Sequence, residues 1–139
     1  MTFITAVKTC FSKYVTFSGR AQRSEYWWWA LFTFLAGVVL SGIDGLLGNG
    51  QTAAGPLSGL FSLITFLPGL SVLARRLHDV NRSAWWMLLL FLPIIGWIVL
   101  LIWTVSKGSD GINRFGDDPL EIPYDAADYT SSVPNVTRD

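Results

Sequence analysis

The chain has 139 residues, of which 51% are apolar and only 14% charged, and its ten basic and ten acidic residues leave no net charge. A soluble domain carries about 25% charged residues, and a nucleic-acid binder is usually strongly basic. Three long stretches contain no Asp, Glu, Lys or Arg: 26–43, 45–74 and 83–106. Because a membrane helix needs roughly 20 apolar residues, the sequence predicts an all-α integral membrane protein. It excludes a water-soluble enzyme and a nucleic-acid partner.

The first residues predict an amphipathic helix over 2–17. Apolar side chains recur at intervals of three and four positions from Phe3 to Phe17, and lysines and threonines occupy the opposite side. This spacing is the helical period. Such a helix can lie in the headgroup plane with its aromatic face toward the lipid. The alternative is that the same face packs on neighbouring protein.

Three apolar stretches predict transmembrane helices over 26–43, 57–74 and 84–106. Eighteen residues at about 1.5 Å each cover about 27 Å, which is enough to cross the hydrocarbon. The third stretch contains Pro93 and Gly96 near its middle. A re-entrant hairpin, which returns the chain to its starting side, is therefore the alternative to a third crossing. Six tryptophans at the ends of these stretches are predicted to lie at the membrane interface: Trp27, Trp28, Trp29, Trp85, Trp86 and Trp103.

The distribution of basic residues predicts how the chain is oriented. Four Lys and Arg precede the first stretch, the loop over 44–56 has none, and the turn over 75–82 has three. Because cytoplasmic segments are enriched in Lys and Arg, the N-terminus and this turn are expected on the cytoplasmic side. We expect one membrane domain over 1–119 and a polar, acidic and disordered tail over 120–139, which three crossings would place on the far side.

Seven polar residues flank the first two stretches on the side predicted to be cytoplasmic. They form the candidate site: Arg20, Arg23, Glu25, Arg75, Arg76, His78 and Asp79. Basic side chains at this depth can hold a lipid phosphate, or they can simply fix the orientation of the helices. Glu25 is the only acid before the first stretch. We therefore predict that Glu25 pairs with Arg75 or Arg76, since a guanidinium satisfies a buried carboxylate.

Catalysis at this cluster would depend on His78 and Asp79 alone. A lipid-modifying enzyme would need a nucleophile or a metal beside that pair, and the sequence contains no pattern for either. The chain has one Cys and one His, which argues against a metal centre. We therefore expect no enzyme activity, no metal and no cofactor.

Three blocks of sequence resemble a known family. Residues 17–28 read FSGRAQRSEYWW, residues 75–79 read RRLHD with Trp85-Trp86 following, and residues 111–119 read GINRFGDDP. In this order they resemble the "domain of unknown function 805" family over about residues 3–119. Asn81 occupies a turn position where the family is expected to have glycine. The resemblance implies a small multi-pass protein of the bacterial inner membrane, and it implies no activity.

The function predicted from the sequence is that of a non-enzymatic membrane-embedded interaction or scaffold protein. Its basic and aromatic collar is expected to engage lipid headgroups or a partner. The expected partners are the bilayer, including anionic phospholipid, and a second copy of the chain or another membrane protein. A subunit of an oligomeric transporter or channel is the alternative, and it requires several copies because three short spans cannot enclose a pore alone.

Overall fold

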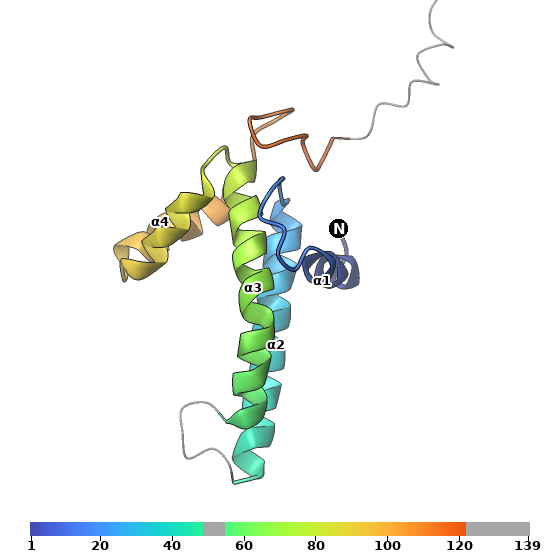
Figure 1. Ribbon diagram of the computed structural model, residues 1–139, viewed down its shortest axis with the longest axis vertical. Coiled ribbons are helices and arrows are strands. Elements are labelled where there is room, and N and C mark those ends of the chain that lie inside the picture. Colours follow the sequence, from blue (N-terminus) through green and yellow to red (C-terminus); the bar gives the residue numbers. More distant parts are fainter. Residues whose placement is uncertain (49–54, 122–139) are drawn as a thin grey trace, which may run out of the picture.

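The computed structural model describes residues 1–48 and 55–121 (Figure 1). It contains five helices, which are α1 (Phe3–Ser12), α2 (Arg23–Leu46), α3 (Pro56–Asp79), the 3-10 helix η1 (Ala84–Phe91) and α4 (Ile95–Val105). Within these residues there is no strand, only one isolated bridge between Asn113 and Gly116. The predicted tail lies outside the described residues from residue 122 onward, as does the middle of the predicted loop over 44–56.

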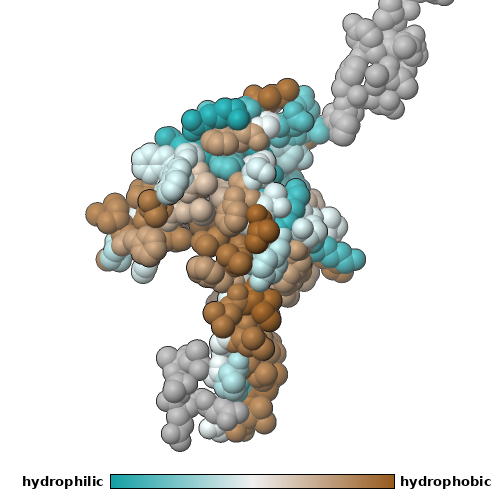
Figure 2. All heavy atoms as spheres, in the orientation of Figure 1, coloured by the Kyte–Doolittle hydropathy of each residue, from teal (hydrophilic) through white to brown (hydrophobic). Residues whose placement is uncertain are grey.

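Helices α2 and α3 form an antiparallel pair along the length of the molecule (Figure 1). Each has 24 residues, which corresponds to about 36 Å. Each is long and apolar enough to cross a membrane. The stretches predicted over 26–43 and 57–74 lie inside these helices. We call residues 27–46 and 56–70 the stem, and its side chains are mostly apolar and exposed (Figure 2).

A buried carboxylate joins the two helices at the closed end of the stem. Asp44 lies inside α2 rather than at its end and is only 1% exposed. Its carboxylate accepts hydrogen bonds from the backbone N–H groups of Leu57 (3.1 Å) and Ser58 (2.9 Å) and from the Ser58 hydroxyl (2.8 Å). Since the first N–H groups of a helix have no partner within it, Asp44 caps α3 from the neighbouring helix.

Helix α1 is shorter than the predicted 2–17 and crosses the stem beside α2, where Figure 1 shows it nearly end-on. Its buried face packs on protein, because Cys10 lies in one cluster with Trp29 and Val72. Trp29 is only 3% exposed. The Trp29 ring is therefore enclosed by protein, and its depth at the membrane interface stays a prediction. Its position on the α2 face that meets α1 and α3 makes it a core residue.

The membrane helix predicted over 84–106 is not formed as one helix. The chain reverses at Pro93 and Ile94, and η1 and α4 pack against each other as a hairpin. Proline lacks an N–H group and disfavours helical geometry in the residue before it. Ile94 takes a positive φ of 68°, and the Ile95 N–H donates to the Pro93 carbonyl at 2.9 Å. A Cβ on Gly96 would overlap the Leu89 carbonyl, so glycine permits the close packing of the two arms.

The hairpin, residues 84–105, starts and finishes beside the end of α3. We call residues 13–26, 71–83 and 106–121 the head. Figure 1 shows the hairpin on one side of α3, α1 on the other, and the segment after α4 passing over the end of α3. Hydrophilic residues gather at this end, whereas the stem and the hairpin are hydrophobic (Figure 2).

Candidate functional site

The end of α3 is buried in the head although it is highly charged. All residues from 71 to 79 are buried. Arg75 and Arg76 have 0% exposure, and Asp79 has 3%. Charged side chains are almost never fully buried without a partner. Their contacts therefore decide what this cluster does.

Asp79 is the centre of one ion network. Its Oδ1 accepts a hydrogen bond from Nε of Arg20 at 2.9 Å and lies 2.9 Å from Nη2 of the same guanidinium, and its Oδ2 accepts from Nη1 of Arg76. Its backbone carbonyl accepts from the backbone N–H (2.7 Å) and the hydroxyl (2.9 Å) of Ser109. The other guanidinium N–H groups donate to backbone carbonyls of Ala21, Thr104, Ser106, Ser109 and Gly111. Asp79 thereby holds α3, the linker before α2 and the segment after α4 together.

Glu25 and Arg75 form a second buried pair, which confirms the pairing predicted for Glu25. Oε1 of Glu25 accepts a hydrogen bond from Nη1 of Arg75. Within the described residues, Nε and Nη2 of Arg75 have no partner. The Cys10 thiol lies 4.0 Å from the same carboxylate oxygen. Burial, and then the charge of Glu25, raise the pKa of Cys10 to about 12.

His78 is engaged in structural contacts. Its Nδ1 donates to the Gly19 carbonyl at 2.9 Å, and its ring stacks on Phe115 with centroids 4.0 Å apart. Its backbone carbonyl accepts from the Asn113 side chain at 2.9 Å. None of its described contacts is with the carboxylate of Asp79 or Glu25. The structure therefore does not assemble the acid–base pair considered from the sequence.

Arg23 alone of the seven candidates is exposed, at the start of α2. Its Nη1 lies 3.4 Å from the Val105 carbonyl. The neighbouring indoles are also fixed by carbonyls, since Nε1 of Trp27 donates to Thr104 at 3.3 Å and Nε1 of Trp28 donates to Met1 at 3.1 Å. Arg23 therefore differs from the other six residues because its charge faces outward.

The remaining predicted interfacial tryptophans lie on the hairpin. Trp85 is 79% exposed and Trp86 is 44% exposed. Trp86 packs edge-on against Trp103, and the Arg82 guanidinium lies 4.9 Å from the centroid of the Trp103 ring. Such a cation–π contact stabilises by about 0.5–1 kcal/mol at an exposed site.

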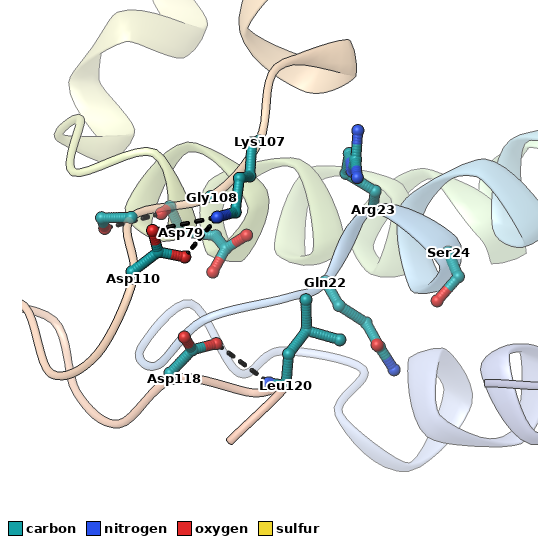
Figure 3. Close-up of a pocket in the computed structure, with 10 residues that line it drawn as sticks. Gln22, Arg23, Ser24, Asp79, Lys107, Gly108, Asp110, Asp118 and Leu120 are labelled. Atoms are coloured by element: carbon teal, nitrogen blue, oxygen red, sulfur yellow. Dashed lines mark hydrogen bonds and ion pairs between the residues drawn. The ribbon is translucent and has the colours of Figure 1, made fainter.

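A polar pocket of about 240 Å³ opens beside the ion network (Figure 3). Lys107 and Asp110 form an exposed ion pair on one side, at 2.7 Å. Asp118 lies on another side and accepts from the backbone N–H groups of Leu120 (2.9 Å) and Gly111 (3.0 Å). These two hydrogen bonds, that from Leu120 first, hold the pKa of Asp118 below its usual value.

Comparison with known proteins assigns the chain to a family. The pattern described as "Protein of unknown function (DUF805)" matches residues 14–117. The chain belongs to the DUF805 family. It is 47% identical over 106 residues to the inner membrane protein YhaI of Escherichia coli K12, covering 76% of this chain and 87% of that protein. It is 44% identical over 111 residues to the inner membrane protein YhaH of the same strain, covering 79% and 92%. The uncharacterized protein YiiR of that strain is 29% identical, covering 84% and 94%. No solved structure matches the chain.

The three blocks that carry the DUF805 resemblance meet in the head. The first supplies Arg20 and Glu25, the second supplies the end of α3, and the third supplies Phe115. Asn81, where DUF805 is expected to have glycine, has a φ of 57°. Glycine and, less readily, asparagine adopt this left-handed conformation. The DUF805 blocks thus meet around the buried, charged end of α3.

Two residues of this DUF805 head were not singled out by the sequence. The Ser71 hydroxyl donates to the carbonyls of Lys13 (2.9 Å) and Thr16 (2.6 Å). The Tyr14 hydroxyl donates to the carbonyl of Ile64. That carbonyl lies four residues before Pro68, which has no N–H group to donate to it. A proline inside an apolar helix was the available signal for a polar side chain nearby.

Proposed function

We propose that this DUF805 protein is a non-enzymatic component of the bacterial inner membrane whose head engages phospholipid headgroups or a protein partner. The names of YhaI and YhaH as inner membrane proteins support the location. The distribution of basic residues supports a cytoplasmic head, because Lys and Arg gather at this end and are missing from the described residues at the closed end of the stem.

The observation that carries this proposal is that the charged side chains of the cluster are bound to other groups of the protein. Both oxygens of Asp79 are occupied by guanidinium groups, and the His78 ring is stacked and hydrogen-bonded. A general acid or base must come within about 3 Å of the group to which it gives a proton or from which it takes one. These side chains instead stabilise the head, so that its outward surfaces carry the function.

The hairpin adds a lipid-facing surface to the head, and we infer that it enters only one leaflet. Its two arms of eight and eleven residues are each about 16 Å long, half of a hydrocarbon core of about 30 Å. Arg76 binds the carbonyls of Thr104 and Ser106 where the hairpin ends. Ser83, the residue before the hairpin, lies near the end of α3. Two stem crossings and one re-entrant hairpin would return the C-terminal segment to the cytoplasmic side.

Cysteine labelling tests the topology in a Cys10→Ser background. Lys8→Cys, Leu47→Cys and Asp110→Cys place single thiols at exposed positions. We expect an impermeant thiol reagent to label positions 8 and 110 from the same side of the membrane and position 47 from the other. Labelling of positions 110 and 47 from one side would refute the one-leaflet hairpin.

Purification tests the function. The protein is extracted in mild detergent, washed extensively and analysed by native mass spectrometry. We expect a retained phospholipid or a stoichiometric protein partner. Retention of neither would contradict the proposal. So would a His78→Phe variant that keeps its abundance but loses a cellular phenotype of the wild type, because the ring stacking would then not account for the role of His78.

A further inference from the structure

A groove runs along one face of α2 below its first turn. It is lined by Ser24, Trp27, Trp28 and Leu31 and has a volume of about 370 Å³. These positions follow the i, i+3, i+4, i+7 spacing and therefore share one face of the helix. Because both indole N–H groups are bonded to carbonyls of other segments, the two rings are held as fixed walls. The shape and chemistry of this groove suit a linear apolar chain.

The polar pocket adjoins the top of this groove, because Ser24 lines both. Figure 3 shows Gln22, Arg23 and Ser24 at the start of α2, on the opposite side from Lys107 and Asp110, with the Arg23 side chain pointing away from those of Gln22 and Ser24. No hydrogen bond within the described residues uses the Ser24 hydroxyl or the Gln22 side-chain amide. Arg23 has one long contact with a carbonyl, at 3.4 Å. Groups that can bind a ligand therefore gather where the polar and apolar spaces meet.

The charges around the pocket are of both signs. Arg23 and Lys107 are two cations and Asp110 and Asp118 are two anions, and of these Lys107 and Asp110 already pair with each other at the exposed rim. The fifth charged group, Asp79, is already neutralised by Arg20 and Arg76. A headgroup with only a negative charge would meet the two carboxylates as well as the cations. A headgroup that carries both a phosphate and an ammonium can pair with both kinds of side chain.

We propose that the pocket and the groove together bind one phospholipid whose headgroup carries a phosphate and a primary ammonium. The phosphate lies against Arg23 and the Ser24 hydroxyl, and the ammonium lies toward Asp110 and Asp118. One acyl chain lies between Trp27 and Trp28. A primary ammonium can donate hydrogen bonds to carboxylates, whereas a quaternary ammonium cannot. This inference rests on the proposed function and names the ligand for its lipid-binding form.

Native mass spectrometry of the delipidated full-length protein tests the proposal. The probes are phosphatidylethanolamine, phosphatidylcholine and phosphatidylglycerol with identical acyl chains, added at equal concentration. We expect one bound phosphatidylethanolamine, with at least tenfold lower retention of the other two. Equal retention of the three lipids, or a preference for phosphatidylglycerol, would overturn the proposed headgroup.

Two pairs of variants locate the site. Leu31→Trp fills the groove, and Leu63→Trp places the same ring on α3 at a position that is 74% exposed. Arg23→Gln removes the pocket cation that has no carboxylate partner within the described residues, and Arg82→Gln removes a cation that lies over Trp103 instead. We expect roughly tenfold weaker retention for the first member of each pair and unchanged retention for the second.

The outcomes separate this inference from the proposed function. Lipid retained equally by Leu31→Trp and Leu63→Trp would overturn the groove as the site, while leaving a lipid-binding head in place. Retention of neither lipid nor protein partner by the wild type would overturn both. Arg23 is exposed, so its variant is expected to fold and keeps the test decisive if Leu31→Trp does not.

Discussion

The change Glu25→Gln tests whether the head depends on its buried ion pairs. Arg75 is 0% exposed and Glu25 is 3% exposed. The other guanidinium nitrogens of Arg75, Nε and Nη2, have no partner within the described residues. The compensation of this buried charge therefore falls on Glu25. Removing one partner of a buried ion pair costs about 3–5 kcal/mol, which is a large part of the 5–15 kcal/mol that typically stabilises a protein.

Cys10 provides the assay, because it is the only cysteine and is fully buried beside the pair. A thiol reagent can reach it only when α1 separates from the helices it packs on, so the labelling rate in detergent reports that opening equilibrium. Since about 1.4 kcal/mol corresponds to a factor of ten, the loss of about 3–5 kcal/mol is expected to accelerate labelling of Glu25→Gln by about two to three and a half orders of magnitude. The matched control is Glu121→Gln, which makes the same change at an exposed position.

The double variant Glu25→Gln with Arg75→Met completes the test. Replacing both members of a buried pair by uncharged groups of similar size is often neutral or stabilising. We therefore expect the double variant to recover most of the loss. The reasoning is refuted if Glu25→Gln labels no faster than Glu121→Gln, or if adding Arg75→Met makes labelling faster still.

Three further changes are expected to alter the thermal unfolding midpoint in detergent. Gly55→Ala should lower it, because a Cβ there overlaps the carboxylate of Asp44 that caps α3, whereas Gly59→Ala has free space and should not lower it. Ile94→Gly should raise it by relieving a positive φ of 68°, which costs about 1–3 kcal/mol in a non-glycine residue; a lower midpoint would contradict this. The pKa of Cys10 is raised to about 12, against 9.0 for the ordinary thiol. The thiol of the unfolded chain therefore ionises first, so the stability that the buried thiol contributes is present below pH 9 and is lost as the pH rises toward 12. The midpoint of the wild type should thus fall more between pH 8 and pH 10.5 than that of Cys10→Ser, and equal falls would argue against the shift.

The sequence by itself determined that the chain is helical and apolar enough for a membrane, and where its two long helices run. The stretches over 26–43 and 57–74 lie within α2 and α3, because a long run without charges has few alternatives to a helix. It also indicated that Glu25 would pair with an arginine from α3. That inference needed only a buried acid and a nearby cation at the same end of two antiparallel helices.

The course of residues 84–106 was decided by the tertiary structure. An apolar stretch has the same composition whether it crosses a membrane or turns back, and Pro93 and Gly96 allow both. The contacts of Arg76 with Thr104 and Ser106, and of Trp27 with Thr104, hold the second arm beside the end of α3. The partners of Arg20, Arg76 and Asp79 were likewise beyond the sequence, which predicted only that Glu25 would pair with an arginine. Several acids and cations gather at that predicted membrane boundary, so only folding decided which of them pair, and of the seven candidates it left Arg23 facing outward.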